Sequence, residues 1–148
     1  MTPPLTSWAS SPATRSVMRG NRARDTRPEL ALRRELHRRG LRFVVQRPAW
    51  PGSRRRVDIA FTRARLAVDV RGCFWHACTE HASQPRTNQQ YWADKLLRNT
   101  ERDLDTERRL GEIGWELVIV WEHEDVASAA DRVSDAYRRR LRSAPPTA

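Results

Sequence analysis

Both cysteines of the chain and two of its four histidines lie in one short stretch, from Asp69 to His81, which reads DVRGCFWHACTEH. Two thiolates and two imidazoles form a closed tetrahedral set that suits a structural zinc ion. The residues that could form such a set are Cys73, Cys78, His81 and His123. Two other interpretations stay open: inert or disulfide-bonded cysteines beside surface histidines, and a set in which His76 is the fourth ligand.

Oxygen ligands form a second group. Asp58 and Asp69 are each the one charge in a short apolar run, and Arg71 follows Asp69 by two residues, which puts both on the same face of a strand. Two converging carboxylates predict a Mg²⁺ site for phosphodiester hydrolysis, with the cation Arg71 binding phosphate. Alternatively, each aspartate pairs with a nearby arginine and has no catalytic role. An unperturbed histidine has a pKa of about 6.5, which suits proton transfer near neutral pH, and a filled four-ligand zinc set would leave His76 available as general base or acid.

Positive charge is concentrated in the first third of the chain. Between Arg15 and Arg56 there are 14 arginines against three acidic residues, and the remainder is close to neutral. This pattern favours a polyanion partner, because the guanidinium group matches phosphate geometry; a merely solvating role is the alternative. The pairs Phe74-Trp75 and Tyr91-Trp92 could stack on bases. For Trp92 alone, packing in the core is the more usual role.

A helix is expected from 28 to 39, because Thr26, Pro28 and Glu29 combine a cap, a first-turn proline and a capping box. Strands are expected at 41–46, 57–61, 66–70 and 115–121, and the last is so continuously apolar that we expect it to be central. A helix over 89–111 would place Trp92, Leu96, Thr100 and Leu104 on one face, and a last amphipathic helix would run from about 126 to 141.

This order of elements predicts an α/β fold, with a small mixed central sheet flanked by helices. We expect a flexible arm at 1–14, one domain at 15–142 and a flexible tail at 143–148. No apolar run is long enough for a membrane span or a signal peptide core, so we expect a soluble, cytoplasmic protein.

Several motifs together resemble the very short patch repair (Vsr) endonucleases. In order, they are Ala13-Thr14-Arg15-Ser16, Arg24-Asp25-Thr26-Arg27-Pro28-Glu29, Gly72-Cys73-Phe74-Trp75-His76, Tyr91-Trp92-Ala93-Asp94-Lys95, Arg98-Asn99, Arg102-Asp103, Gly114-Trp115 and Val120-Trp121-Glu122. The match covers about residues 14 to 141. The GCFWH block with its flanking cysteine and histidine is the most specific part.

The resemblance implies a nuclease of the PD-(D/E)xK type, with a restriction-endonuclease-like fold, that nicks the thymine strand 5′ of a T:G mismatch left by deamination of 5-methylcytosine. It implies double-stranded DNA as the partner of a bacterial monomer, together with other mismatch-repair proteins, and Mg²⁺ and structural Zn²⁺ as cofactors. By position, the active-site residues would be Asp58, His76, Glu29 and Asp103, and the strand pattern described above adds Asp69. The residues on DNA would be Phe74, Trp75, Trp92 and, by a weaker parallel, Met18, and the zinc ligands would be Cys73, Cys78, His81 and His123. Charge adds Arg15, Arg71 and Lys95 to the residues expected on DNA.

Two positions depart from the family pattern. Val57-Asp58 stands where many members have Pro-Asp, and Asp69-Val70-Arg71 stands where members commonly have Phe-Val-Asp or Phe-Thr-His. Asp69 thus restores an acid at the general nuclease position, and Arg71 places a cation beside Gly72. A nuclease of this type with another DNA target and a non-catalytic, zinc-stabilised DNA-binding module are the alternatives.

Overall fold

The structure, a computed structural model, describes residues 25–73 and 87–143. Within these ranges the chain forms a four-stranded sheet in the order β1-β2-β3-β4. The strands are β1 (Val44–Pro48), β2 (Arg56–Phe61), β3 (Leu66–Arg71) and β4 (Glu116–Trp121). The pairs β1–β2 and β2–β3 are antiparallel, whereas β3 and β4 are parallel. The predicted mixed α/β sheet is therefore confirmed.

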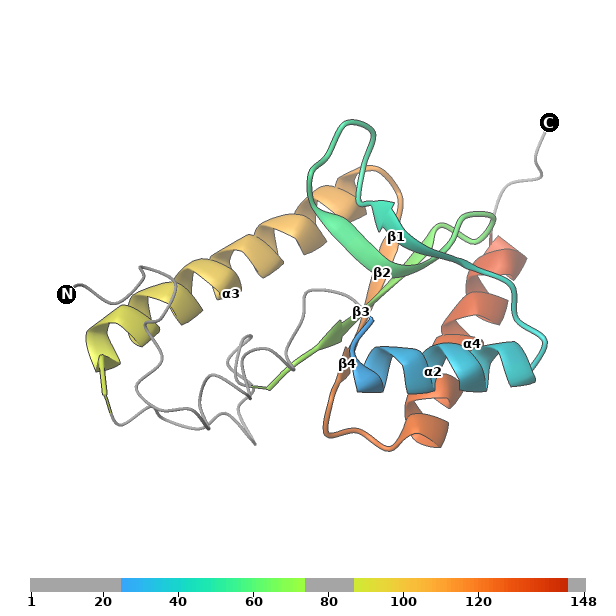
Figure 1. The fold of residues 1–148 in the computed structure, drawn as a ribbon. Helices are drawn as coiled ribbons and strands as arrows, with labels where there is room; N and C mark the ends of the chain where they lie inside the picture. Colours follow the sequence, from blue (N-terminus) through green and yellow to red (C-terminus); the bar gives the residue numbers. More distant parts are fainter. Residues whose placement is uncertain (1–24, 74–86, 144–148) are drawn as a thin grey trace.

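Helices cover both faces of this sheet (Figure 1). On one face, α2 (Arg27–Arg38) and α4 (Val126–Ser143) lie side by side. Their apolar residues enclose the larger core with the sheet; its fully buried members include Leu32, Leu36, Ile59, Phe61, Leu66, Val68 and Val133. On the other face, α3 (Gln89–Glu112) covers a smaller core, made of Ala49, Val57, Ala60, Ala67 and Leu110.

The start of α2 is as predicted. Thr26 Oγ1 accepts a hydrogen bond from the Glu29 backbone N–H at 3.4 Å, and the Glu29 carboxylate accepts one from the Thr26 N–H at 3.3 Å. This capping box satisfies two N–H groups that would otherwise lack partners at the helix terminus. It also holds the buried Glu29 side chain at the end of α2 nearest to the candidate site.

The last predicted strand exists, but its expected central position is wrong. Among the described strands, β4 pairs with β3 alone and lies at the edge of the sheet. Its run of apolar residues has a different cause, because Val118 and Val120 pack into the larger core with residues of α4, and Leu117 packs against the smaller core beside α3. A strand that packs on both faces is apolar throughout, whatever its place in the order.

The first strand also differs from its predicted bounds. It was expected at 41–46 with a loop after it, but β1 runs through Arg47 and Pro48, which pair with Val57 and Arg56 of β2. An edge strand tolerates proline, because the missing N–H need not face a neighbour. Leu41 and Phe43 precede the strand and pack against the larger core.

The predicted apolar face of α3 is only partly present. Trp92, Thr106 and Leu110 are buried, whereas Leu104 is 62% exposed. Residues four apart drift by about 40° per step around a helix, so Leu104 lies about a third of a turn from Trp92. Only the C-terminal part of α3 lies on the sheet, and its first turns extend beyond it (Figure 1). No helix in 25–73 or 87–143 has the length and apolarity needed to cross a membrane.

Candidate active site

Asp58 and Asp69 lie on adjacent strands, where β2 and β3 separate. The ladder between these strands ends at the pair Ile59 and Val68, so the Val70 N–H has no backbone partner on β2. Asp58 Oδ2 accepts that N–H at 2.7 Å, and Asp69 Oδ1 accepts the Asp58 N–H at 3.4 Å. The two carboxylates thus end the ladder, each by accepting a backbone N–H of the opposite strand.

A glutamine that the sequence reasoning missed connects this pair to α2. The amide nitrogen of Gln46, on β1, donates to Glu29 Oε1 at 2.8 Å and to Asp58 Oδ1 at 3.3 Å. The backbone φ of Gln46 is +52°, in the left-handed region that residues other than glycine rarely adopt. Residues in this region are often found at functional sites. Nothing in a strand-like run of residues signals that backbone conformation.

Glu29 supports the site from α2. Its Oε1 accepts hydrogen bonds from Gln46 and from Arg33 Nη2, the latter at 2.7 Å, and its Oε2 accepts the Thr26 N–H. The side chain is nearly fully buried, and both oxygens are already engaged. This arrangement suits a residue that orients Gln46 and, through it, Asp58.

The ionisation of Asp58 is strongly perturbed. Burial raises its pKa, the negative charges of Asp69 and Glu29 raise it further, and the pKa reaches about 8. Hydrogen bonds from the Val70 N–H and the Gln46 amide act in the opposite direction but do not outweigh these effects. At neutral pH, Asp58 therefore carries a proton that a bound cation would displace.

Arg71 and Asp103 lie next to the pair of aspartates, on the side that faces α3. The Arg71 side chain is 8% exposed and lies 3.8 Å from Asp69 Oδ2 and 3.9 Å from Asp103 Oδ2, the latter on α3. These separations allow ionic attraction but are too long for hydrogen bonds. Sequence spacing predicted Arg71 beside Asp69; the approach of Asp103 depends on how α3 lies across the sheet.

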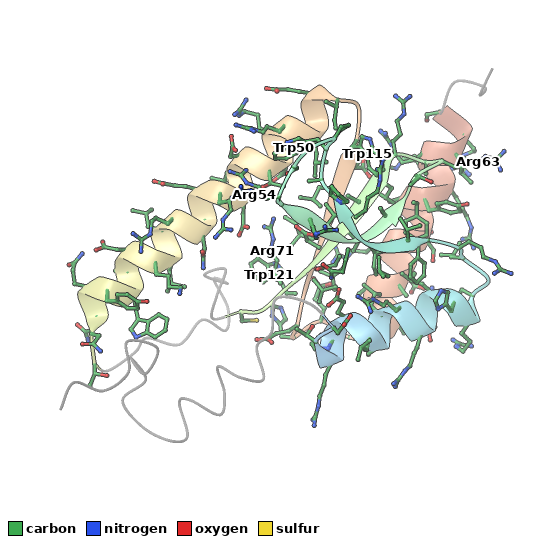
Figure 2. All side chains as sticks on the ribbon, turned by 45° about the horizontal axis from the view of Figure 1, so that its top comes forward. Trp50, Arg54, Arg63, Arg71, Trp115 and Trp121 are labelled. Atoms are coloured by element: carbon green, nitrogen blue, oxygen red, sulfur yellow. The ribbon has the colours of Figure 1, made fainter. Side chains whose placement is uncertain are left out.

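All these groups except Glu29 line one cavity of about 520 Å³ between the sheet and α3. Its lining consists of Gln46, Arg54, Arg55, Arg56, Asp58, Asp69, Val70, Arg71, Asn99, Arg102, Asp103 and Thr106. Carboxylates lie at the strand ends, and arginines from the β1–β2 connection and α3 surround them. Figure 2 shows Arg71 deep between α3 and the sheet, with Arg54 nearer to the β1–β2 connection. A negative centre within a positive rim suits a metal ion together with a phosphate chain.

Comparison with known proteins agrees with this geometry. The family model described as "DNA mismatch endonuclease Vsr" matches residues 9–81. The Type II nicking enzyme V.NaeI of Lentzea aerocolonigenes is 42% identical over 80% of this chain and 72% of its own length. The DNA mismatch endonuclease Vsr of Escherichia coli (strain K12) is 39% identical over 74% of this chain and 70% of its own length.

The chain belongs to the Vsr family. A further relative, the Type II nicking enzyme V.XorIIP of Xanthomonas oryzae pv. oryzae, is 37% identical over 81% of this chain and 87% of its own length. The chain is accordingly a DNA nicking endonuclease, which does not agree with the alternative of a non-catalytic DNA-binding module.

A Vsr-family nuclease implies a divalent metal ion, and the donor set at the cavity fits one. Asp58 and Asp69 offer hard oxygen ligands, and the raised pKa of Asp58 reports negative charge that a cation would neutralise. Within 25–73 and 87–143, no three residues of the His, Cys, Asp and Glu types form a group that could hold a metal ion. Two carboxylates suffice for Mg²⁺, because that ion usually keeps several waters and takes further ligands from substrate phosphates.

Two of the four predicted zinc ligands come together. Cys73 Sγ lies 3.1 Å from His123 Nδ1, although the two residues are 50 apart in sequence. The Cys73 N–H also donates to Glu122 Oε1 at 2.9 Å, which fixes the end of β3 to the residue that follows β4. Cys78 and His81 lie outside the described residues, so the complete zinc set stays a prediction.

Of the other residues predicted to contact DNA or act in catalysis, some lie within the described ranges and some lie outside them. Trp92, one of the residues expected to contact bases, is 5% exposed and packs edge-on against Tyr91 at 5.3 Å between ring centroids. Lys95, one turn further along α3, is half-buried. The predicted residues Arg15, Met18, Phe74, Trp75 and His76 lie outside the described ranges.

Proposed function

We propose that this chain nicks the thymine strand on the 5′ side of a T:G mismatch in double-stranded DNA, in a reaction that requires Mg²⁺, and so begins very short patch repair. The observation that carries the proposal is the pairing of Asp58 with Asp69 at the floor of an arginine-rimmed cavity. The matching family model, described as a DNA mismatch endonuclease, supports the choice of a mismatch as target.

Each part of the cavity has a role in this reaction. Asp58 and Asp69 would hold Mg²⁺, and Gln46 would keep the Asp58 carboxylate oriented from β1. Bound Mg²⁺ activates water and neutralises charge that develops on the phosphate. The exposed arginines Arg54 and Arg102 would contact neighbouring phosphates of the backbone.

Residues outside the described ranges complete the proposal. His76 would transfer the proton, because an imidazole titrates near neutral pH. Phe74 and Trp75, with Met18, would open the base stack beside the mismatch. Trp92 would join them only if the side chain, now buried, moves on binding. A structural zinc ion on Cys73, Cys78, His81 and His123 would anchor the segment that carries Phe74, Trp75 and His76.

A panel of duplexes tests the target. Duplexes that contain T:G, G:C, A:C and the other mismatches in one sequence context are incubated with enzyme and Mg²⁺, and nicks are located on each strand by gel. We expect nicking of the T:G duplex alone, on the thymine strand and 5′ of the thymine. Equal nicking of the matched duplex would refute mismatch specificity.

A pair of variants tests the site. Asp58→Ala and His76→Ala should abolish nicking of the T:G duplex while mismatch binding is preserved, because both side chains serve the chemical step. Glu116→Gln is the matched control, since Glu116 pairs with Arg139 at 2.8 Å, away from the cavity lining, and this variant should nick at the wild-type rate. Full activity of Asp58→Ala would refute the proposed mechanism.

The second candidate function is nicking at another DNA target. Several similar proteins are named Type II nicking enzymes, including the 42% identical relative, and those names specify no mismatch. The same panel separates the candidates, because this alternative expects Mg²⁺-dependent nicks that do not follow the T:G pair.

A further inference from the structure

Arg71 is a buried cation with two side-chain nitrogens that have no hydrogen-bond partner within the described residues. The residue is 7% exposed, and in the ranges 25–73 and 87–143 neither its Nε nor its Nη2 has a hydrogen-bond partner. Among the described residues, acidic oxygens of Asp69 and Asp103 lie 3.8 Å and 3.9 Å from its guanidinium nitrogens. Leaving buried N–H donors unpaired is costly, and a ligand that accepts from them would remove that cost.

The position of Arg71 indicates what that ligand is. Residues 69 and 71 project from the same face of β3, with Cα atoms about 7 Å apart, so the guanidinium lies beside the proposed metal pair. A phosphate held at Asp58 and Asp69 would present a second oxygen toward Arg71. The planar fork of a guanidinium accommodates two phosphate oxygens, and N–H to phosphate bonds are stronger than neutral ones.

The other arginines of the cavity are less suited to this role. Arg55 is already bound, by Asp105 at 2.6 Å and by Thr106 at 3.1 Å. Arg56 donates to the backbone carbonyl of Gln46. Arg54 and Arg102 are exposed at the rim, where they can follow the backbone on either side. Among the arginines described in the cavity lining, Arg71 is thus the one at the depth of the carboxylates.

We propose that Arg71 donates directly to non-bridging oxygens of the scissile phosphate, and that Asp103 positions it from α3. The proposal rests on the proposed phosphodiester hydrolysis at Asp58 and Asp69. Negative charge grows on those oxygens as water adds to phosphorus, and it passes to the leaving oxygen when that bond breaks. A fixed buried cation therefore stabilises the transition state more than the bound substrate, so its loss should lower the rate constant more than the affinity.

The test compares Arg71→Gln with Arg54→Gln, which removes a rim cation from the same cavity. Single-turnover nicking is measured at saturating enzyme on whichever duplex the wild type nicks fastest, and Kd is measured on the same duplex. We expect Arg71→Gln to lower the rate constant by about a hundredfold or more, with Kd within about threefold of wild type. Arg54→Gln should weaken Kd and leave the rate constant within about threefold of wild type.

Arg71→Lys keeps the charge without the fork and should recover part of the rate, which separates lost chemistry from lost folding. A rate constant within threefold of wild type for Arg71→Gln would overturn the proposal, and so would an effect confined to Kd. If Arg71→Gln does not fold, Arg71→Lys is measured on substrates with one non-bridging oxygen of the scissile phosphate replaced by sulfur. If Arg71 contacts the phosphate directly, the effects of Arg71→Lys and of the sulfur substitution on the rate constant should be non-additive for one stereoisomer of the substrate. Additive effects for both stereoisomers would overturn the proposal.

Choosing the fastest duplex keeps the two proposals separable. If the wild type shows no preference for T:G, the proposed target fails while the role of Arg71 is still measured. If the wild type prefers T:G and Arg71→Gln retains its rate, the role of Arg71 fails alone.

Discussion

The raised pKa of Asp58 couples Mg²⁺ affinity to pH. With a pKa of about 8 in the metal-free protein, only about one tenth of Asp58 is ionised at pH 7, and Mg²⁺ must displace the proton from the remainder. Below the pKa, affinity should rise about tenfold per pH unit, which amounts to about fifty-fold between pH 6 and 8. Above pH 8 the gain should level off at about twofold. An aspartate with an ordinary pKa would show no dependence in this range.

Calorimetric titration of the DNA-free protein with Mg²⁺ at pH 6, 7, 8 and 9 measures this dependence. Two buffers that differ in ionisation enthalpy also report proton release, which should approach one proton per metal ion at pH 6 to 7 and disappear at about pH 9. Asp58→Asn should lose both the high affinity and its dependence on pH. The control Glu116→Gln should keep both, because Arg139 holds the pKa of Glu116 below its usual range and that residue stays ionised throughout.

Affinity that changes by less than about threefold between pH 6 and 8, without proton release, would refute the reasoning. Such a result would mean that Asp58 is ionised before the metal ion binds. Burial and the nearby carboxylates of Asp69 and Glu29 would then not disfavour its charge in solution as they do in this structure.

Four further outcomes are expected. Asp58→Asn should raise the free energy of unfolding of the metal-free protein at pH 8 by up to about 5 kcal/mol, a gain that shrinks as pH falls toward 4 because the wild-type carboxyl is then protonated in both states; urea unfolding at several pH values checks this. Thr26→Ala should cost about 1 kcal/mol of stability by removing the cap of α2, measured in the same way. Affinity for duplex DNA should fall with salt at a logarithmic slope of about −0.9 per phosphate contacted, and a flat response would contradict the role given to the arginines. Cys73→Ser should lose zinc, measured by elemental analysis, together with nicking, and nicking retained without zinc would show that the two sites are independent.

Local signals in the sequence predicted several elements well. The capping box at Thr26 and Glu29 predicted the start of α2, because the hydrogen bonds involved are made within one turn. The short run 66–70 predicted β3 to within one residue, because it alternates between two buried faces. Asp58 and Asp69 could be paired because antiparallel strands joined by a short turn must lie side by side.

Other features depended on contacts that a local pattern does not contain. The apolar run of β4 appeared central, yet it is an edge strand covered by helices. Periodicity along α3 indicated a buried face through Leu104, but the helix lies on the sheet only near its C-terminal end. Sequence spacing alone does not say which turns of a helix meet the sheet.

The sequence itself determined which chemical groups the candidate site contains and their order along the chain. These are acids on neighbouring strands, a cation two residues beyond the second acid, and thiols and imidazoles beside them. Their energetics were decided by tertiary structure. Gln46 reaches Glu29 and Asp58 only because β1 pairs with β2 while α2 begins beside them. The raised pKa of Asp58, and the Arg71 N–H groups that have no partner in 25–73 and 87–143, have the same origin. Both features result from burial and from charges that lie far away in the sequence. Such burial and such charges come together only when distant segments enclose one cavity.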